Sequence, residues 1–454
     1  MKKKVLIANR GEIAVRIIKA CKELGIETVL VVSEADTESM GARLADEAVC
    51  IGPPQVNLSY LDIPKIINTA LETGADAIHP GYGFLAENPE LPEACEKNGI
   101  IFIGPRSETM RQLGDKISAR NLARKSNVPM TEGSEGLGSF NDVEAEVQKI
   151  GFPVIFKAAA GGGGRGMRIV MEQKDLKNAF DMASNEALQA FGDATLFVER
   201  YVQNARHVEV QIIGDDFGKV IHVGQRDCSP QRHHQKVIEE AHPYNLPDDL
   251  RDKILESAVA LTSSIGYNSA GTVEFLVDKD RNEFYFMEVN TRIQVEHPVT
   301  EEIAGIDLVK EQIHVAFKAP LSLNQEDVKF KGHAIECRIT AEDTKDDFMP
   351  SPGCLENFVL PKGNNIRVDT HCYQGYTISP YYDSLLAKLI TTGETREEAL
   401  ANMKTALLDF KIEGIETNIP FLQFIIEQPE FIAGDIHIKW IENQVLPIFI
   451  ESIQ

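Results

Sequence analysis

The chain has 454 residues, which is enough for about three domains. Hydrophobic residues make up 43% and charged residues 25%, which excludes an intrinsically disordered protein. The 46 basic and 69 acidic residues give a net charge of −23. This balance argues against a nucleic-acid-binding protein or one that binds anionic membranes, because both need an exposed basic face.

The lengths of the apolar runs and the spacing of the cysteines indicate in which compartment the protein is expected. No apolar run has the ~20 residues that a membrane-spanning helix needs, and Asn9 interrupts the N-terminal run too early for a signal peptide. The seven cysteines include no CxxC pair, which disfavours a disulfide framework or a zinc knuckle. We therefore expect a protein of the reducing cytoplasm.

The first 110 residues alternate short apolar runs with amphipathic segments. This order is typical of a parallel, doubly wound α/β sheet. Strands are predicted at 5–8, 28–32, 75–78 and 100–103, and helices at 12–24, which Gly25 ends, and at 63–72.

The pattern changes after Gly114. Strands at 154–158 and 168–170 flank a glycine-rich stretch, and 272–278 and 284–290 are predicted to form an antiparallel pair. A third unit begins near residue 331, and its clearest element is a helix with an apolar stripe. That helix begins at the capping box of Thr395 and is expected to end at Gly414.

Four consecutive glycines, 161–164, follow Lys157 in the central region. Glycine lets backbone N–H groups approach a ligand closely, which suits phosphate oxygens. No Gly-Lys-Ser/Thr follows the run, so it is not a P-loop, and the first strand–helix turn lacks GxGxxG. The run is either a hairpin that covers phosphate or a plain surface loop.

Polar residues occupy every even position from Glu288 to Glu296. If this segment is extended, these side chains share one face, and the predicted hairpin places Glu274 opposite Glu288. Two carboxylates so close together need either a bound cation or a raised pKa in one of them. Hard oxygen ligands of this kind suit Mg²⁺. The alternative is a strand with a solvated polar face.

Two further clusters leave their roles open. Gln231 to Lys236 contains two adjacent histidines; adjacent strand residues face opposite sides, so we favour an anion or nucleotide site over zinc. Arg338 lies in an apolar strand. It is either a structural ion pair, with Glu336 or a neighbour, or a catalytic group.

Together these residues resemble the biotin carboxylases of the ATP-grasp ligase superfamily. The similarity covers essentially the whole chain and rests on the segments 7–14, 79–85, 161–167, 235–240, 286–300 and 379–384. It implies a Rossmann-like N-terminal domain at 1–114, an ATP-grasp domain at 115–330 with a mobile lid near 131–203, and a C-terminal α+β domain at 331–454.

The resemblance also implies roles for single residues. The matching ATP-binding positions are Lys116, Lys157, Gly163, Gly164, Glu199, Arg200, Tyr201, Val202, His207, Gln231 and His234, with Glu274, Glu288 and Asn290 for Mg²⁺ or, alternatively, Mn²⁺. The bicarbonate pocket matches Lys236, Arg292, Gln294, Val295 and Glu296, with Glu296 as general base, and Arg338 matches the arginine beside biotin. Three positions depart from the family, since Arg200 replaces lysine, His233 replaces arginine and Ala160 shortens the glycine run.

The implied reaction is carboxylation of biotin through carboxyphosphate. The nearest match to a biotinyl-lysine turn, around Lys404, lies in a predicted helix, so we expect the biotin on a separate carrier protein. The expected setting is a homodimer that works with carboxyltransferase subunits of acetyl-CoA carboxylase in fatty-acid synthesis.

Other functions stay open. The same subunit could serve a pyruvate or other acyl-CoA carboxylase. More distant alternatives are another ATP-grasp ligase, a non-catalytic nucleotide sensor, and a dinucleotide-dependent oxidoreductase, which the missing GxGxxG disfavours.

Overall fold

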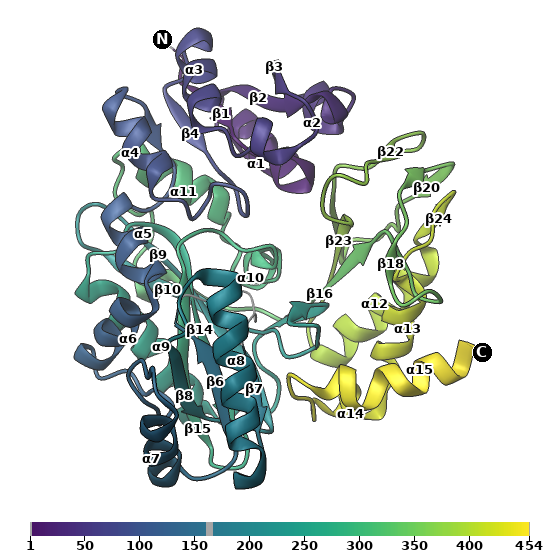
Figure 1. Ribbon diagram of the computed structural model, residues 1–454. Coiled ribbons are helices and arrows are strands. Elements are labelled where there is room, and N and C mark those ends of the chain that lie inside the picture. The colour runs from purple at the N-terminus through teal and green to yellow at the C-terminus, as the bar shows by residue number, and fades with distance from the viewer. Residues whose placement is uncertain (1, 160–166, 454) are drawn as a thin grey trace.

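A computed structural model describes residues 2–159 and 167–453 (Figure 1). The N-terminal part is a five-stranded parallel sheet in the order β3-β2-β1-β4-β5, as the alternation of elements predicted. Its elements are β1 (Lys4–Ile7), α1 (Gly11–Glu23), β2 (Glu27–Ser33), α2 (Met40–Leu44), β3 (Glu47–Gly52), α3 (Ile63–Thr73), β4 (Ala77–His79), α4 (Glu90–Lys97) and β5 (Ile101–Phe102).

Strand β1 shows why helices cover both faces of this sheet. All of its central residues are apolar, and Val5 and Ile7 pack with α1 while Leu6 packs with α3. Side chains alternate along a strand, so a continuous apolar run needs cover on each side. Helix α1 ends before Gly25, whose φ of +69° is the left-handed conformation expected there.

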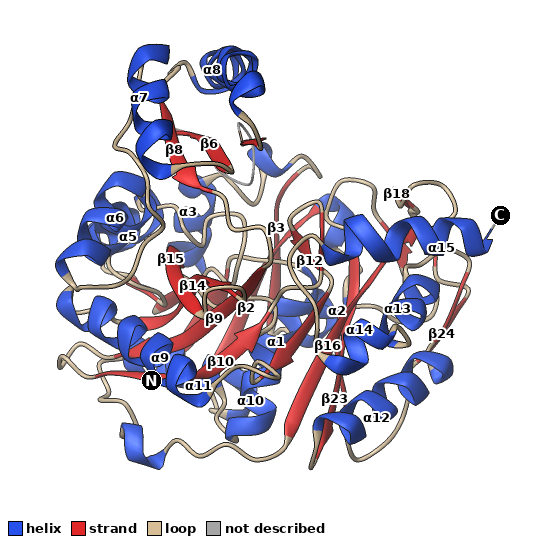
Figure 2. Ribbon diagram, turned by 90° about the horizontal axis from the view of Figure 1, so that it is seen from below, coloured by secondary structure: helices blue, strands red, loops and turns tan. Residues whose placement is uncertain are grey.

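A small separate unit follows two connecting helices, α5 (Ser107–Gly114) and α6 (Lys116–Lys125). It is a three-stranded antiparallel sheet with its own apolar core, and Figure 2 shows it standing away from the large sheet. Its elements are α7 (Phe140–Ile150), β6 (Val154–Ala158), β7 (Arg168–Val170), α8 (Leu176–Phe191) and β8 (Leu196–Arg200).

An eight-stranded antiparallel sheet forms the body of the molecule and continues across residue 330, into the predicted C-terminal domain. In spatial order its strands are β15 (Glu283–Asn290), β14 (Ser269–Asp278), β9 (Ala205–Gly214), β10 (Val220–Asp227), β13 (Ile238–Ala241), β16 (His333–Thr340), β23 (Leu385–Gly393) and β21 (Ile366–Thr370). The helices beside it are α9 (Asp248–Ser264), α10 (His297–Ala304) and α11 (Leu308–Ala316).

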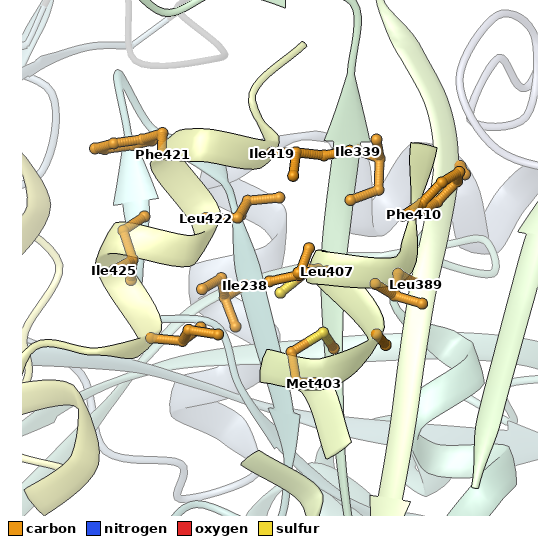
Figure 3. Close-up of a cluster of buried hydrophobic side chains, with 14 of the residues drawn as sticks. Ile238, Ile339, Leu389, Met403, Leu407, Phe410, Ile419, Phe421, Leu422 and Ile425 are labelled. Carbon is orange, nitrogen blue, oxygen red and sulfur yellow. The ribbon is translucent and has the colours of Figure 1, made fainter. Parts of the chain in front are cut away.

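C-terminal helices cover one face of this sheet. Ile238, Ile339 and Leu389 project from three adjacent strands toward Met403 and Leu422 of the helices (Figure 3). We call this the back face; the opposite side of β13, β16 and β23 is the cleft face. The C-terminal helices are α12 (Arg396–Asp409), α13 (Ile419–Ile426), α14 (Pro429–Ala433) and α15 (Leu446–Ile453).

Short strand pairs complete the molecule. They are β11 (Gln231–Arg232) with β12 (Gln235–Lys236), β17 (Glu342–Asp343) with β18 (Met349–Pro350), β19 (Gly353–Cys354) with β22 (Thr377–Ile378), and β20 (Asn357–Val359) with β24 (Lys411–Glu413). The β20–β24 pair corrects one expectation. The helix that begins at Thr395 ends at Asp409 rather than at Gly414, because residues 411–413 pair with a distant strand. Within the described residues, no helix is long and apolar enough to cross a membrane.

Candidate active site

A cleft of about 1290 Å³ lies where the three parts of the chain meet. Tyr82 of the N-terminal part, Lys157 of the small unit and Arg338 of β16 all line it. Most of the sequence-predicted site residues line it too: Lys116, Lys157, Glu199, His207, Gln231, His234, Lys236, Glu274, Glu288, Asn290, Arg292, Gln294, Val295, Glu296 and Arg338. Arg200, Tyr201 and Val202 are not among its lining residues, and Gly163 and Gly164 lie outside the described residues.

The hairpin of β14 and β15 has the register that the sequence predicted. Glu274 lies directly opposite Glu288, and the register shifts immediately after Glu274. Burial and the nearby Glu274 carboxylate raise the pKa of Glu288, although this side chain is open to the cleft. Two carboxylates on one hairpin face therefore repel each other, which is the arrangement that a bound cation relieves.

The extended run expected from Glu288 to Glu296 is wrong beyond Asn290. Strand β15 ends there, and the chain turns before α10 begins at His297. The polar side chains still face the cleft, because the turn rather than a strand directs them: Arg292 donates to Asn290 Oδ1 at 3.3 Å and to Glu87 Oε2 at 2.9 Å.

Lys236 is the charge centre of the cleft. Its ammonium donates to Glu209 and Glu296 at 2.6 Å each, to Gln294 at 2.9 Å and to Glu274 at 3.0 Å. Burial by itself lowers the pKa of Lys236, but the surrounding carboxylates reverse this and raise it well above its ordinary value. Lys236 thus joins the predicted metal side of the cleft to the predicted bicarbonate side.

Arg338 and Glu296 form the next ion pair along the cleft. Arg338 donates through Nη2 to Glu296 Oε2 at 3.0 Å and through Nε to Glu239 Oε1 at 2.6 Å. Its partners are therefore Glu239 and Glu296, and both carboxylate oxygens of the buried Glu336 lack a hydrogen-bond partner. Burial opposes ionisation of Glu296, yet Lys236 and Arg338 hold its pKa well below the ordinary range.

The expectation that the two adjacent histidines lie in a strand is wrong. His233 and His234 form the turn between β11 and β12, with φ of 51° and 64°. The donor cluster is elsewhere: Gln231 and His207 are hydrogen-bonded at 2.8 Å, and His207 Nε2 lies 3.3 Å from Glu274. Zinc ligation by the histidine pair finds no support among the described residues, where neither histidine belongs to a metal-binding group.

The small unit brings a lysine to the cleft, already paired with a carboxylate. Lys157 donates to Glu199 Oε2 at 2.7 Å, and Arg120 donates to the other oxygen at 2.6 Å. Arg200, which follows Glu199 in the chain, is not directed into the cleft. It is buried and donates to Asp278 at 3.1 Å and to the Tyr285 hydroxyl at 2.6 Å. Arg200 therefore ties the end of β8 to the large sheet.

Sequence reasoning missed Glu87, Glu209 and Glu239, each of which pairs with a predicted cleft cation. One of them had a visible signal. His207-Val-Glu209-Val-Gln211 alternates polar and apolar residues with the same period as the segment 288–296, and Glu209 lies opposite Glu274 in the sheet.

Sequence profiles of three known domains match this chain in order. They are the N-terminal domain of biotin carboxylase at residues 1–110, the ATP-binding domain of the carbamoyl-phosphate synthase L chain at 115–324, and the C-terminal domain of biotin carboxylase at 336–443.

Similar proteins match over nearly the whole chain. Biotin carboxylase 1 of Bacillus subtilis is 50% identical over 446 residues, which are 98% of this chain and 99% of the relative. One of the pyruvate carboxylase subunits of Methanothermobacter thermautotrophicus is 48% identical, with 97% and 89% covered. The biotin carboxylase domain dimer of Hydrogenobacter thermophilus 2-oxoglutarate carboxylase, solved with MgADP, ADP and bicarbonate, has a TM-score of 0.92 at 45% identity, with 99% of each chain covered. This chain belongs to the biotin carboxylase family.

Proposed function

We propose that the protein carboxylates biotin on a separate carrier protein, with ATP and bicarbonate as co-substrates and carboxyphosphate as the intermediate. The observation that carries this proposal is the position of Lys236, whose ammonium bridges Glu274 and Glu296 within one cleft. A phosphate site and an anion site that share one cation suit a reaction that joins phosphate to bicarbonate. The similarity to a domain solved with MgADP and bicarbonate supports the same substrates.

Glu274, Glu288 and Asn290 would hold Mg²⁺ or Mn²⁺. All three offer oxygen ligands, and the repulsion that raises the pKa of Glu288 would fall when a divalent cation binds. Such an ion would supply positive charge that neutralises the phosphate oxygens during transfer.

The nucleotide is assigned to the side of the cleft next to the small unit. Lys116 and Lys157 would contact phosphate, so Lys157 has to exchange its bond to Glu199 for a phosphate oxygen. The remaining proposed ATP-binding positions are Gly163, Gly164, Glu199, Arg200, Tyr201, Val202, His207, Gln231 and His234. The small unit would act as a lid that moves when ATP binds, and Arg200 would anchor its hinge to Asp278.

Bicarbonate is assigned to Lys236, Arg292, Gln294 and Val295, with Glu296 as the base that removes its proton. The low pKa of Glu296 comes from Lys236 and Arg338, so an anion that draws Lys236 away would remove part of what opposes the effect of burial. Burial raises the pKa of a carboxylate and makes it a stronger base. Substrate binding would thus prepare Glu296 for its task.

Arg338 is assigned to biotin. Its guanidinium would stabilise negative charge that develops on the ureido oxygen when the ureido nitrogen loses its proton, with released phosphate as the base. The pairing with Glu239 and Glu296 fixes the guanidinium in place before biotin arrives.

A more specific proposal concerns the final acceptor, to which the carboxyl group passes from biotin. We propose a homodimer in the cytoplasm that serves acetyl-CoA carboxylase and fatty-acid synthesis, together with a biotin carboxyl carrier protein and carboxyltransferase subunits. Pyruvate carboxylase is the second candidate, because one of its subunits is 48% identical. Co-purification of the carboxyltransferase, followed by assay with acetyl-CoA and with pyruvate, distinguishes the two.

The reaction itself is tested with the purified protein. Cleavage of ATP should depend on bicarbonate, and labelled bicarbonate should appear in acid-labile carboxybiotin when free biotin is supplied. ATP cleavage that is indifferent to bicarbonate contradicts the proposal.

Glu288→Lys tests the metal site. It places a fixed cation among the proposed metal ligands and should abolish Mg²⁺-dependent ATP cleavage, while the melting temperature stays near that of the wild type because Glu288 is open to the cleft. Glu256→Lys makes the same charge change on the exposed side of α9 and serves as the matched control. Near-normal ATP turnover in Glu288→Lys removes this metal assignment.

A further inference from the structure

One buried lysine of the large sheet has no part in the roles assigned above. Lys388 of β23 has no exposed surface, and it lies directly opposite Arg338 in the pairing of β16 with β23. Both side chains therefore share the cleft face of the sheet. A buried ammonium is costly unless its surroundings bind it, so the contacts of Lys388 indicate what it does.

Lys388 makes two short contacts. Its ammonium donates to the Val295 carbonyl at 2.8 Å and lies 3.2 Å from Glu12 Oε1 of α1. Asp369 of β21 is farther away at 4.0 Å, and Arg367 already pairs with that carboxylate. One contact is with the N-terminal part of the chain and the other is with the turn that carries the cleft residues 294–296.

That turn is held by buried side chains through its backbone. The carbonyl of Gln294 lies 2.8 Å from His297 Nδ1, and the next carbonyl, that of Val295, is the one that Lys388 binds. The side chains on either side of Val295, Gln294 and Glu296, both contact Lys236. A shift of the Val295 carbonyl would therefore move both groups relative to Lys236.

We infer that Lys388 is a positioning residue for the bicarbonate pocket: its ammonium fixes the Val295 carbonyl and so sets where Gln294 and Glu296 meet Lys236. This inference rests on the proposed function, which places bicarbonate at that pocket. Glu12 is the nearest opposite charge to Lys388, and Glu12 in turn accepts a hydrogen bond from the Tyr82 hydroxyl.

The alternative role is simple charge balance, in which Lys388 only neutralises Glu12. Two variants separate these roles. Lys388→Met keeps the length of the side chain and removes its hydrogen bonds, whereas Glu12→Gln removes the charge that would need balancing. Lys388→Met is therefore made both in the wild type and in Glu12→Gln, and the second background keeps the experiment decisive if the single variant folds poorly.

The measurement is the KM for bicarbonate and the KM for ATP in bicarbonate-dependent ATP cleavage, with the melting temperature of each variant. We expect Lys388→Met to raise the bicarbonate KM roughly tenfold, the size expected for one lost hydrogen bond from a charged group, and to change the ATP KM less than about twofold. The same rise should appear when Lys388→Met in the Glu12→Gln background is compared with Glu12→Gln alone.

Two results would overturn the inference. One is an unchanged bicarbonate KM in Lys388→Met; the other is a rise that disappears in the Glu12→Gln background, which would reduce Lys388 to a counter-ion. Failure of the proposed function is distinguishable from both, because it would show as ATP cleavage by the wild type that does not respond to bicarbonate.

Discussion

Two adjacent glutamates of β13 show how differently the faces of the large sheet treat a buried carboxylate. Glu239 and Glu240 are both buried, and alternation along the strand points them to opposite faces. On the cleft face, Glu239 accepts from Arg338 with one oxygen, while its other oxygen is buried without a partner. Burial outweighs the arginine, and the pKa of Glu239 rises to about 7.

On the back face, every oxygen of Glu240 is bound. Arg396 donates to its two oxygens at 2.7 and 2.8 Å, and His333 Nε2 lies 2.9 Å away. Burial alone would raise the pKa of Glu240, but these hydrogen bonds outweigh it and lower the pKa to about 2. The back face therefore uses its charges for stability, whereas the cleft face leaves carboxyl groups unsatisfied next to the proposed substrate sites.

The largest expected effect comes from removing the arginine of the back face. Arg396→Met leaves Glu240 buried without its main partner and should lower the free energy of unfolding by about 3–5 kcal/mol, the usual cost of breaking a buried ion pair. Urea denaturation of the variant measures this loss. Arg43→Met, at an exposed arginine, should cost far less. Equal stability of the two variants would contradict the contrast between the faces.

The arginine of the cleft face should behave in the opposite way. Arg338→Gln should reduce carboxylation of free biotin by roughly 10²–10³-fold, as when one donor to a developing oxyanion is lost. Its melting temperature should fall little, because Glu239, with a pKa of about 7, can take up a proton when its partner is gone. ATP affinity should be nearly unchanged, since the proposed nucleotide contacts lie elsewhere.

Three measurements on that variant decide its role: nucleotide affinity, melting temperature and carboxylation rate. A large loss of stability with a parallel loss of every activity would make Arg338 a structural ion pair. A stable variant that carboxylates biotin at the wild-type rate would remove Arg338 from the mechanism.

Local patterns predicted the features that depend on nearby residues. The opposition of Glu274 and Glu288 follows from a strand period of two and a short turn, and the strand at Val154–Ala158 follows from its apolar run. Failures occurred where a distant segment decides the structure. Phe410 continues the apolar stripe of α12, yet the helix ends at Asp409. Strand β24 begins directly after Phe410 because residues 411–413 pair with β20.

The contacts of charged side chains at the cleft were likewise not predictable from local patterns. Lys388 and the Val295 carbonyl that it binds are 93 residues apart in the chain, and Arg338 and Glu239 are 99 apart. No periodicity links such positions, so only the order of strands in the sheet brings them together. Motif resemblance could mark Arg338 but could not identify Glu239 as its partner.

The smallest expected effect concerns the proton on Glu336, which lies opposite Glu239 on the cleft face. Burial raises the pKa of Glu336 well above its ordinary value of 4.5, and Lys388 only partly opposes this. The unfolded chain loses this proton near pH 4.5 while the folded protein keeps it. Stability from this group therefore falls as the pH rises above that value, because folding must then take up a proton.

Glu336→Gln removes that requirement, since an amide is neutral at every pH. The variant should gain stability relative to the wild type as the pH rises above 4.5, by at most about 1.4 kcal/mol for each pH unit, until the folded protein also loses the proton. The change of this stability difference with pH identifies the proton as its cause, because a change in packing alone would alter the stability by the same amount at every pH. Glu256→Gln, on the exposed side of α9, should give a flat difference. A flat difference for Glu336→Gln as well would mean that Lys388 keeps Glu336 ionised, and the cleft face would then hold its carboxylates charged, as the back face holds Glu240.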